Sequence, residues 1–156
     1  APIEAALAHG LVPVVQGDVA VDVVRGGTIV STEDVFGYLA PRLRPRRVLL
    51  AGRERGVLTR WPDGDVIPEI AGAIGQAPLR HIGGSHAADV TGGMAAKVRE
   101  TLALAASVPG CEILIFSGEA PENVRRALLG EAVEGTRLGG ERPAPRLPAE
   151  EPAEGR

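Results

Sequence analysis

Short runs of apolar and β-branched residues alternate with amphipathic stretches along most of the chain. Such runs are typical of buried strands, whereas apolar residues at helical spacing are typical of helices that cover a sheet. The predicted strands are Leu11–Val15, a hairpin of Val19–Val24 and Thr28–Val30, Arg47–Ala51, Gly56–Thr59, Cys111–Phe116, and Val133–Leu138 at an edge of the sheet.

Three amphipathic stretches are flanked by residues that favour the start or the end of a helix. Ser31 and Asp34 have the spacing of a capping box, and Tyr38 is expected on the inner face of the helix that follows. The segment Trp61–His86 is predicted to be a mostly irregular connection. Strands separated by helices in this order predict an α/β domain with a largely parallel sheet. The predicted helices are Thr32–Pro41, Gly93–Ser107 and Pro121–Leu129, the last followed by Gly130.

Composition narrows the class of protein. The 156 residues are 44% hydrophobic, which is enough for one domain, and we expect it to span residues 1–138. Residues 139–156 are rich in Pro, Glu and Gly and predict a disordered tail. A single cysteine, Cys111, favours a reducing, cytoplasmic setting. A net charge of −3 with few aromatic residues argues against nucleic-acid binding, and no apolar run is long enough for a membrane span.

The stretch "DVTGGMAAKV" (Asp89–Val98) carries the first candidate chemistry. A helix beginning at Gly93 directs free backbone N–H groups toward its start, and the side chain of Lys97 reaches back toward the same turn. Because Gly92 and Gly93 allow a ligand to approach the backbone closely, the pattern predicts an anion site, and phosphate is the anion that we expect there. A solvated lysine on a surface helix is the alternative for an arbitrary pattern of this kind. The spacing is not that of a Walker A loop.

Five stretches in order extend this interpretation, and the set closely resembles the isopentenyl phosphate kinases of the amino acid kinase superfamily. The resemblance implies a three-layer α/β/α sandwich with a mostly parallel sheet. It also implies an enzyme that uses Mg-ATP to phosphorylate isopentenyl phosphate and forms a homodimer when complete. The stretches are "PVVQGDVAVD" (13–22), "GGTIVSTEDVFGYLAPRL" (26–43), "RVLLAGRERGVLTRWP" (47–62), "ADVTGGMAAKV" (88–98) and "FSGEAPENVRRALLGEAVEGTRL" (116–138).

The resemblance also implies roles for individual residues. Gly93 and Lys97 match the family's ATP-binding glycine and lysine, and Gly92 belongs to the same turn. In the acceptor segment, Thr32 stands where a glycine is usual and offers its backbone N–H to the substrate phosphate. Glu33 stands where an aspartate orients the catalytic lysines.

Two further segments match less completely. Gly17 and Asp18 match a "GD" on the substrate side. The segment Arg53–Gly56 matches a nucleotide-side motif usually read Asp-Val-Asp-Gly, of which only Gly56 is retained. At position 53 an arginine replaces the aspartate that is usual in the family. Contacts of Arg53 with the nucleotide would therefore be made by a different side chain.

The family's glycine-rich phosphate loop and substrate histidine have no counterpart in the chain. His81 and His86 do not match that histidine, and we expect no metal site built by the protein. The chain is therefore expected to be the C-terminal, nucleotide-binding portion of such a kinase and to be incomplete for activity by itself. Two other readings stay open: another small-molecule kinase of the superfamily, and a non-catalytic nucleotide-binding module.

Overall fold

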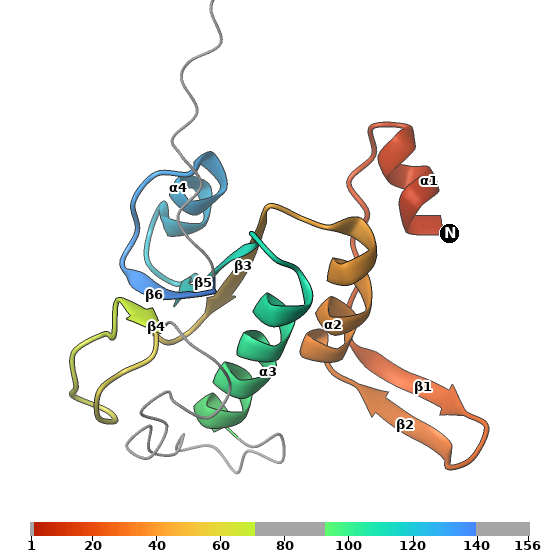
Figure 1. Cartoon of the computed structure of the whole chain (residues 1–156), viewed down its shortest axis with the longest axis horizontal. Coiled ribbons are helices and arrows are strands. Elements are labelled where there is room, and N and C mark those ends of the chain that lie inside the picture. The colour runs from red at the N-terminus through yellow and green to blue at the C-terminus, as the bar shows by residue number, and fades with distance from the viewer. Residues whose placement is uncertain (1, 71–92, 140–156) are drawn as a thin grey trace, which may run out of the picture. The chain divides into compact units, whose positions relative to one another are not determined.

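The computed structural model describes residues 2–70 and 93–139 (Figure 1). The chain divides into two compact units, residues 1–44 and residues 45–156. Gly92, His81, His86 and residues 140–156 of the tail predicted to be disordered lie outside the described residues. Among the described residues, no helix has the length and apolarity that crossing a lipid bilayer requires.

The first unit contains two helices and a β-hairpin. Helix α1 spans Pro2–Ala8, strand β1 spans Asp18–Asp22, β2 spans Gly26–Val30, and α2 spans Thr32–Leu43. The antiparallel pairing of β1 with β2 confirms the predicted hairpin. The strand predicted over Leu11–Val15 is wrong: this segment has no regular secondary structure and no strand partner among the described residues. Apolar β-branched residues adopt a strand only when a neighbouring strand accepts their hydrogen bonds.

The start of α2 has the predicted capping box. The side-chain hydroxyl of Ser31 accepts a hydrogen bond from the backbone N–H of Asp34 at 3.0 Å, and the Asp34 carboxylate accepts one from the Ser31 backbone N–H at 2.9 Å. The helix continues past Pro41 to Leu43 and ends with Arg44 in the left-handed region, at a φ of 46°.

The prediction that Tyr38 faces inward is wrong. Its ring is exposed, and the Arg42 guanidinium lies 3.6 Å from the ring centroid. Residues four apart on a helix are neighbours, so this stacking covers the ring without burying it in a core.

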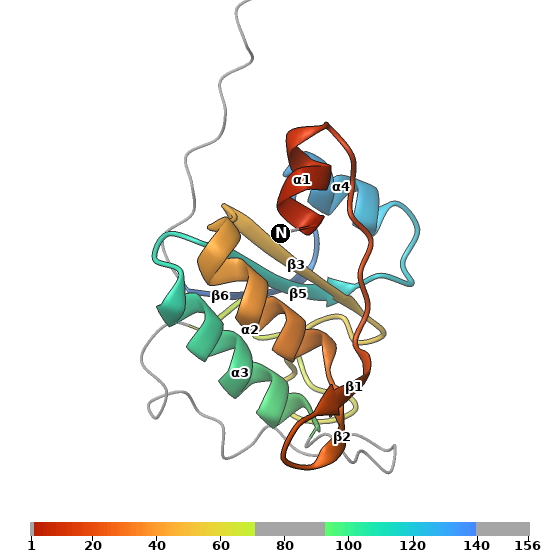
Figure 2. The same ribbon diagram turned by 90° about the vertical axis from the view of Figure 1, so that its right-hand side faces the viewer.

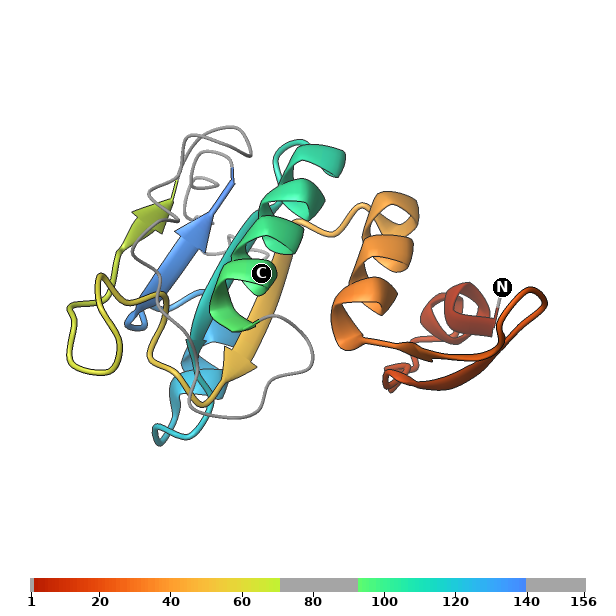
Figure 3. The same ribbon diagram turned by 90° about the horizontal axis from the view of Figure 1, so that it is seen from below.

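The second unit is built on a four-stranded sheet in the order β3-β5-β6-β4 (Figure 3). Two of its three pairings are parallel, and β5 with β6 is antiparallel. The last strand, β6, is not at an edge as predicted, because the short strand β4 pairs with its other side. The predicted strand Gly56–Thr59 is reduced to one bridge between Leu58 and Val66. The strands span Arg47–Gly52 (β3), Glu69–Ile70 (β4), Glu112–Ser117 (β5) and Gly135–Leu138 (β6).

Helices α3, Gly93–Ser107, and α4, Asn123–Leu129, lie on opposite faces of this sheet (Figure 2). Successive side chains of β5 point to opposite faces, and residues 113–116 are all buried, so both faces of the strand are covered. Leu114 and Phe116 form a core cluster with Ala127 of α4. The unit therefore has the predicted three layers, with the most apolar strand near its centre.

Arg47 holds the C-terminal end of α4. Its guanidinium donates hydrogen bonds to the carbonyl oxygens of Ala127 and Leu128, each at 2.9 Å. A cation suits this position because the last carbonyls of a helix have no partners within the helix. Gly130 closes the helix in the left-handed conformation, at a φ of 81°, as its sequence position predicted.

Candidate functional site

The candidate nucleotide site, in the second unit, lies where the parallel strands β3 and β5 end. Helix α3 leads directly into β5 and packs against it in the opposite direction, so its N-terminus lies at the carboxyl ends of both strands (Figure 2). Gly93 is the first residue of α3, and Lys97 lies one turn inside it, partly buried. Ligands of open α/β sheets bind at the carboxyl ends of strands, and a helix N-terminus there favours an anion.

The loops that follow β3 and β5 are bonded to each other. The backbone N–H of Gly118 donates to the Gly52 carbonyl oxygen at 2.8 Å, and the Ser117 hydroxyl donates to the Arg53 carbonyl oxygen at 3.4 Å. Arg53 Nε lies 3.2 Å from a carboxylate oxygen of Glu119, with side chains 87% and 65% exposed. An exposed pair of this kind contributes about 0–1 kcal/mol to stability.

Arg55 and Val57 attach the loop after β3 to β6 and to the residue before it. Arg55 pairs with Glu134 at 3.3 Å, and the backbone N–H of Val57 donates to the Thr136 hydroxyl at 2.7 Å. None of these partners was predicted from the sequence, because the bonded residues lie 64 to 79 positions apart along the chain.

Gly56 has a packing role in addition to its predicted role in nucleotide binding. A Cβ at this position would lie 2.8 Å from both the Thr136 hydroxyl oxygen and a methyl carbon of Val66. Gly56→Ala should therefore lower the free energy of unfolding by about 1–3 kcal/mol, the usual cost of overpacking. Gly52→Ala is the matched control, because a Cβ at Gly52 would meet no atom within 4 Å. Urea unfolding of both variants measures the difference, and equal midpoints would contradict the packing role.

A separate set of candidate residues lies in the first unit, at the start of α2. A Cβ at Gly17 would lie 2.5 Å from the Val30 carbonyl oxygen and 2.9 Å from the Thr32 nitrogen, so only glycine fits against this junction. Asp18 follows directly and pairs with Val30 in the hairpin. The fold thus gathers Gly17, Asp18, Thr32 and Glu33 around the first turn of one helix.

This first turn is strongly acidic. Glu33 is half-buried and Asp34 is exposed, and both lie where the helix presents its free N–H groups. Hydrogen bonds from the Ser31 backbone N–H and from its hydroxyl hold the pKa of Asp34 below its usual range. The carboxylate of Asp34 therefore serves as part of the helix cap.

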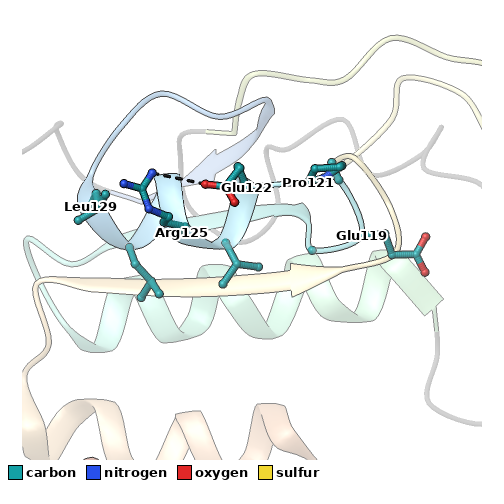
Figure 4. A pocket seen from close by; sticks show the side chains of 9 residues that line it. Glu119, Pro121, Glu122, Arg125 and Leu129 are labelled. Carbon is teal, nitrogen blue, oxygen red and sulfur yellow. Dashed lines mark hydrogen bonds and ion pairs between the residues drawn. The ribbon is translucent and has the colours of Figure 1, made fainter.

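A hollow of about 680 Å³ lies beside the site, between the loop after β5 and helix α4 (Figure 4). Glu122 and Arg125 form an ion pair of 3.4 Å within it, and Leu129 lines its far end. Glu119 lines the hollow and also pairs with Arg53, which connects the two regions. None of the residues predicted for the site lines the hollow.

The predicted site residues thus fall into two sets. Gly17, Asp18, Thr32 and Glu33 belong to the first unit, whereas Arg53, Gly56, Gly93 and Lys97 belong to the second. Within the described residues, no three His, Cys, Asp or Glu side chains gather in a way that could hold a metal ion.

Comparison with known proteins identifies the family. The model of the amino acid kinase family matches residues 1–117, three quarters of the chain. The chain belongs to the amino acid kinase family. This result agrees with the α/β architecture of the second unit and with the resemblance seen in the sequence.

Several relatives of this member of the amino acid kinase family are named isopentenyl phosphate kinase. The isopentenyl phosphate kinase of Methanothermobacter thermautotrophicus is 40% identical over 88% of the chain and 52% of its own length. The Haloferax volcanii enzyme of that name is 47% identical over 81% of the chain and 51% of its own length. A crystal structure titled as isopentenyl phosphate kinase aligns with a TM-score of 0.69 and 35% identity, covering 88% of this chain and 50% of that one. The chain therefore spans about half the length of the relatives that it matches.

Proposed function

We propose that this chain is the nucleotide-binding portion of an ATP-dependent kinase that converts isopentenyl phosphate to isopentenyl diphosphate. The observation that carries the proposal is the 35–47% identity to three isopentenyl phosphate kinases over more than four fifths of the chain. Cytoplasmic location, use of magnesium and a homodimeric complete enzyme belong to the same proposal. They rest on the family and on the sequence composition.

In this proposal the second unit holds the nucleotide. Gly92 and Gly93 let the triphosphate approach the start of α3, and Lys97 places its ammonium group against the charge that develops on the transferred phosphoryl group. Phosphoryl transfer depends mainly on positioning and on charge stabilisation, so a lysine and a helix N-terminus supply the needed chemistry. Arg53 and Gly56 border the same strand ends. Magnesium is held chiefly by phosphate oxygens and water in such enzymes, and we assign no residue of this chain as its ligand.

The first unit serves the acceptor. The backbone N–H of Thr32, at the exposed start of α2, is proposed to meet the acceptor phosphate, with Gly17 and Asp18 packed against that turn. Glu33 is proposed to orient the cations at the reaction centre. Close packing at Gly17 supports this assignment, because it holds the turn in one shape without covering it with a side chain.

Two alternatives have support of their own. Another small-molecule kinase of the superfamily would have the same nucleotide site, since we expect the choice of acceptor to depend on the half of the family's length that this chain does not match. A non-catalytic module is favoured by the replaced nucleotide segment, in which Arg53 and Arg55 are each paired with a glutamate.

Activity assays with the chain and with a completed enzyme separate these possibilities. Residues 1–156 alone should give no measurable phosphorylation of isopentenyl phosphate, because the family's glycine-rich phosphate loop and substrate histidine have no counterpart in them. In-line transfer requires donor and acceptor held about 3–3.5 Å apart, which we expect to need those missing groups. A chimera that joins the unmatched part of the Methanothermobacter enzyme to this chain should produce the diphosphate.

Each outcome has a clear meaning. Robust turnover by residues 1–156 as a monomer would overturn the proposed division of labour. A folded chimera that hydrolyses or binds ATP but transfers phosphate to a different acceptor would support the first alternative. A folded chimera without ATP binding would favour the non-catalytic module.

A further inference from the structure

Two arginines follow strand β3 at the carboxyl edge of the sheet in the second unit. Arg53 and Arg55, called the arginine pair below, are exposed, whereas Glu54 between them is half-buried. Strand β6 also begins at this edge, because its first residue, Gly135, is paired with Phe116 near the end of β5. Helix α3 begins at the same edge (Figure 2). The arginine pair therefore adds positive charge to the edge of the sheet at which α3 presents its free N–H groups.

Each arginine of the pair contacts one exposed glutamate. Arg53 Nε lies 3.2 Å from a carboxylate oxygen of Glu119, and Arg55 Nη1 lies 3.3 Å from a carboxylate oxygen of Glu134. All four side chains are more than half exposed, and exposed ion pairs of this kind are weak. A guanidinium has five N–H donors in a planar fork, so one such contact leaves donors for a second anion. Each arginine can therefore exchange a weak partner for a stronger one.

We propose that the arginine pair binds the triphosphate of the nucleotide, and that phosphate oxygens replace the two glutamates as its partners. The inference rests on the proposed nucleotide site at the start of α3 and adds two cations to it. A guanidinium fork binds phosphate oxygens in bidentate geometry, and a triphosphate carries several negative charges. Where two aspartates are usual in the family, this chain has Arg53 and Arg55, so this edge attracts an anion instead of repelling it.

Both substrates of the proposed reaction carry phosphate, and the position of the arginine pair favours the nucleotide. The arginine pair and Gly93, the first residue of α3, belong to the second unit, whereas Thr32, proposed to meet the acceptor, belongs to the first. The Gly118 backbone N–H donates to the Gly52 carbonyl oxygen at 2.8 Å, which keeps the loop that begins with Arg53 beside the end of β5. The nucleotide is thus the substrate whose proposed site shares a unit with the arginine pair.

Neutralising the arginines in a complete kinase that contains this chain tests the inference. Arg53→Gln and Arg55→Gln should each weaken the binding of Mg-ATP at least about fivefold, because each removes a hydrogen bond to a charged group. The KM for isopentenyl phosphate should stay close to that of the parent. Arg125→Gln is the matched control, since Arg125 forms an exposed ion pair of 3.4 Å on α4 and its loss should leave ATP binding unchanged. Isothermal titration calorimetry measures the dissociation constants, and circular dichroism checks that each variant is folded.

The glutamate partners provide a second measurement with the opposite sign. Glu119→Gln removes the anion that competes for Arg53, so Mg-ATP should bind about two- to fivefold more tightly, which is the range that a weak exposed pair allows. This gain should disappear in the double variant Arg53→Gln, Glu119→Gln, because no arginine is left to release. Glu122→Gln, which breaks the ion pair on α4, is the matched control and should leave ATP binding unchanged. A purely structural role of Glu119 would not give a gain that depends on Arg53.

Three results would overturn the inference. Unchanged ATP binding in both folded arginine variants would mean that the arginine pair contacts no phosphate of the nucleotide. A raised KM for isopentenyl phosphate with unchanged ATP binding would assign the pair to the acceptor. An equal effect of Glu119→Gln with and without Arg53 would contradict the exchange of partners. The proposed function is judged separately: a parent enzyme that binds ATP without phosphorylating isopentenyl phosphate would contradict that function, and the arginine variants would still test the pair.

Discussion

Lys97→Ala, in a complete kinase that contains this chain, should reduce kcat by about 10- to 150-fold. The proposed ammonium contact with the transferred phosphoryl group is a hydrogen bond to a charged group, and losing one costs about 1.5–3 kcal/mol. Stability should change little, because Lys97 is only partly buried on α3 and alanine is a good helix former. Steady-state kinetics and thermal unfolding of the same preparation measure the two effects.

Lys97→Arg provides the matched control for charge. Its planar guanidinium keeps the positive charge but cannot occupy the place of a compact ammonium group, so activity should recover only in part. Full activity of Lys97→Ala would contradict the proposed role and support the alternative, a solvated lysine on the surface of α3. A parallel loss of kcat and of unfolding temperature would indicate a structural role instead.

Glu33→Gln should depress turnover strongly while the unfolding temperature stays nearly constant. Glutamine keeps the shape and the helix propensity of glutamate and removes only the charge that we propose orients the cations of the reaction centre. A carboxylate in the first turn of a helix also interacts favourably with the macrodipole, typically by 0.3–1 kcal/mol. If that were its whole role, the variant would lose a little stability and no activity.

The neighbouring Asp34 is the control for a first-turn carboxylate. Its carboxylate accepts hydrogen bonds from the Ser31 backbone N–H and hydroxyl, so Asp34→Asn should destabilise the cap by about 0.5–2 kcal/mol. Turnover of this variant, measured well below its unfolding temperature, should stay close to that of the parent. The two variants thus remove the same charge one residue apart with opposite expected effects. Equal turnover of Glu33→Gln and Asp34→Asn would contradict the role of Glu33.

Local patterns predicted local structure well. The capping box at Ser31, helix Gly93–Ser107 and the hairpin all follow from residues within one turn or one strand pairing of each other. The failures have a common cause. Leu11–Val15 has the residue types of a strand but no strand partner, and Tyr38 has helical spacing but no core opposite it. Both properties depend on what lies across space.

The sequence alone determined the family, the order of most elements and the candidate residues. Motifs such as "DVTGGMAAKV" and "VSTED" place the residues of one candidate site within a few positions of each other, so they can be recognised without the fold. Only the tertiary structure decided that β6 is an interior strand and that Arg53 is paired with Glu119. It alone also decided that Gly56 packs against Thr136 and that Val21 faces outward. These features join residues far apart along the chain or choose between two faces of one strand. Period-2 alternation marks the two faces of a strand, but which of them is covered depends on the rest of the fold.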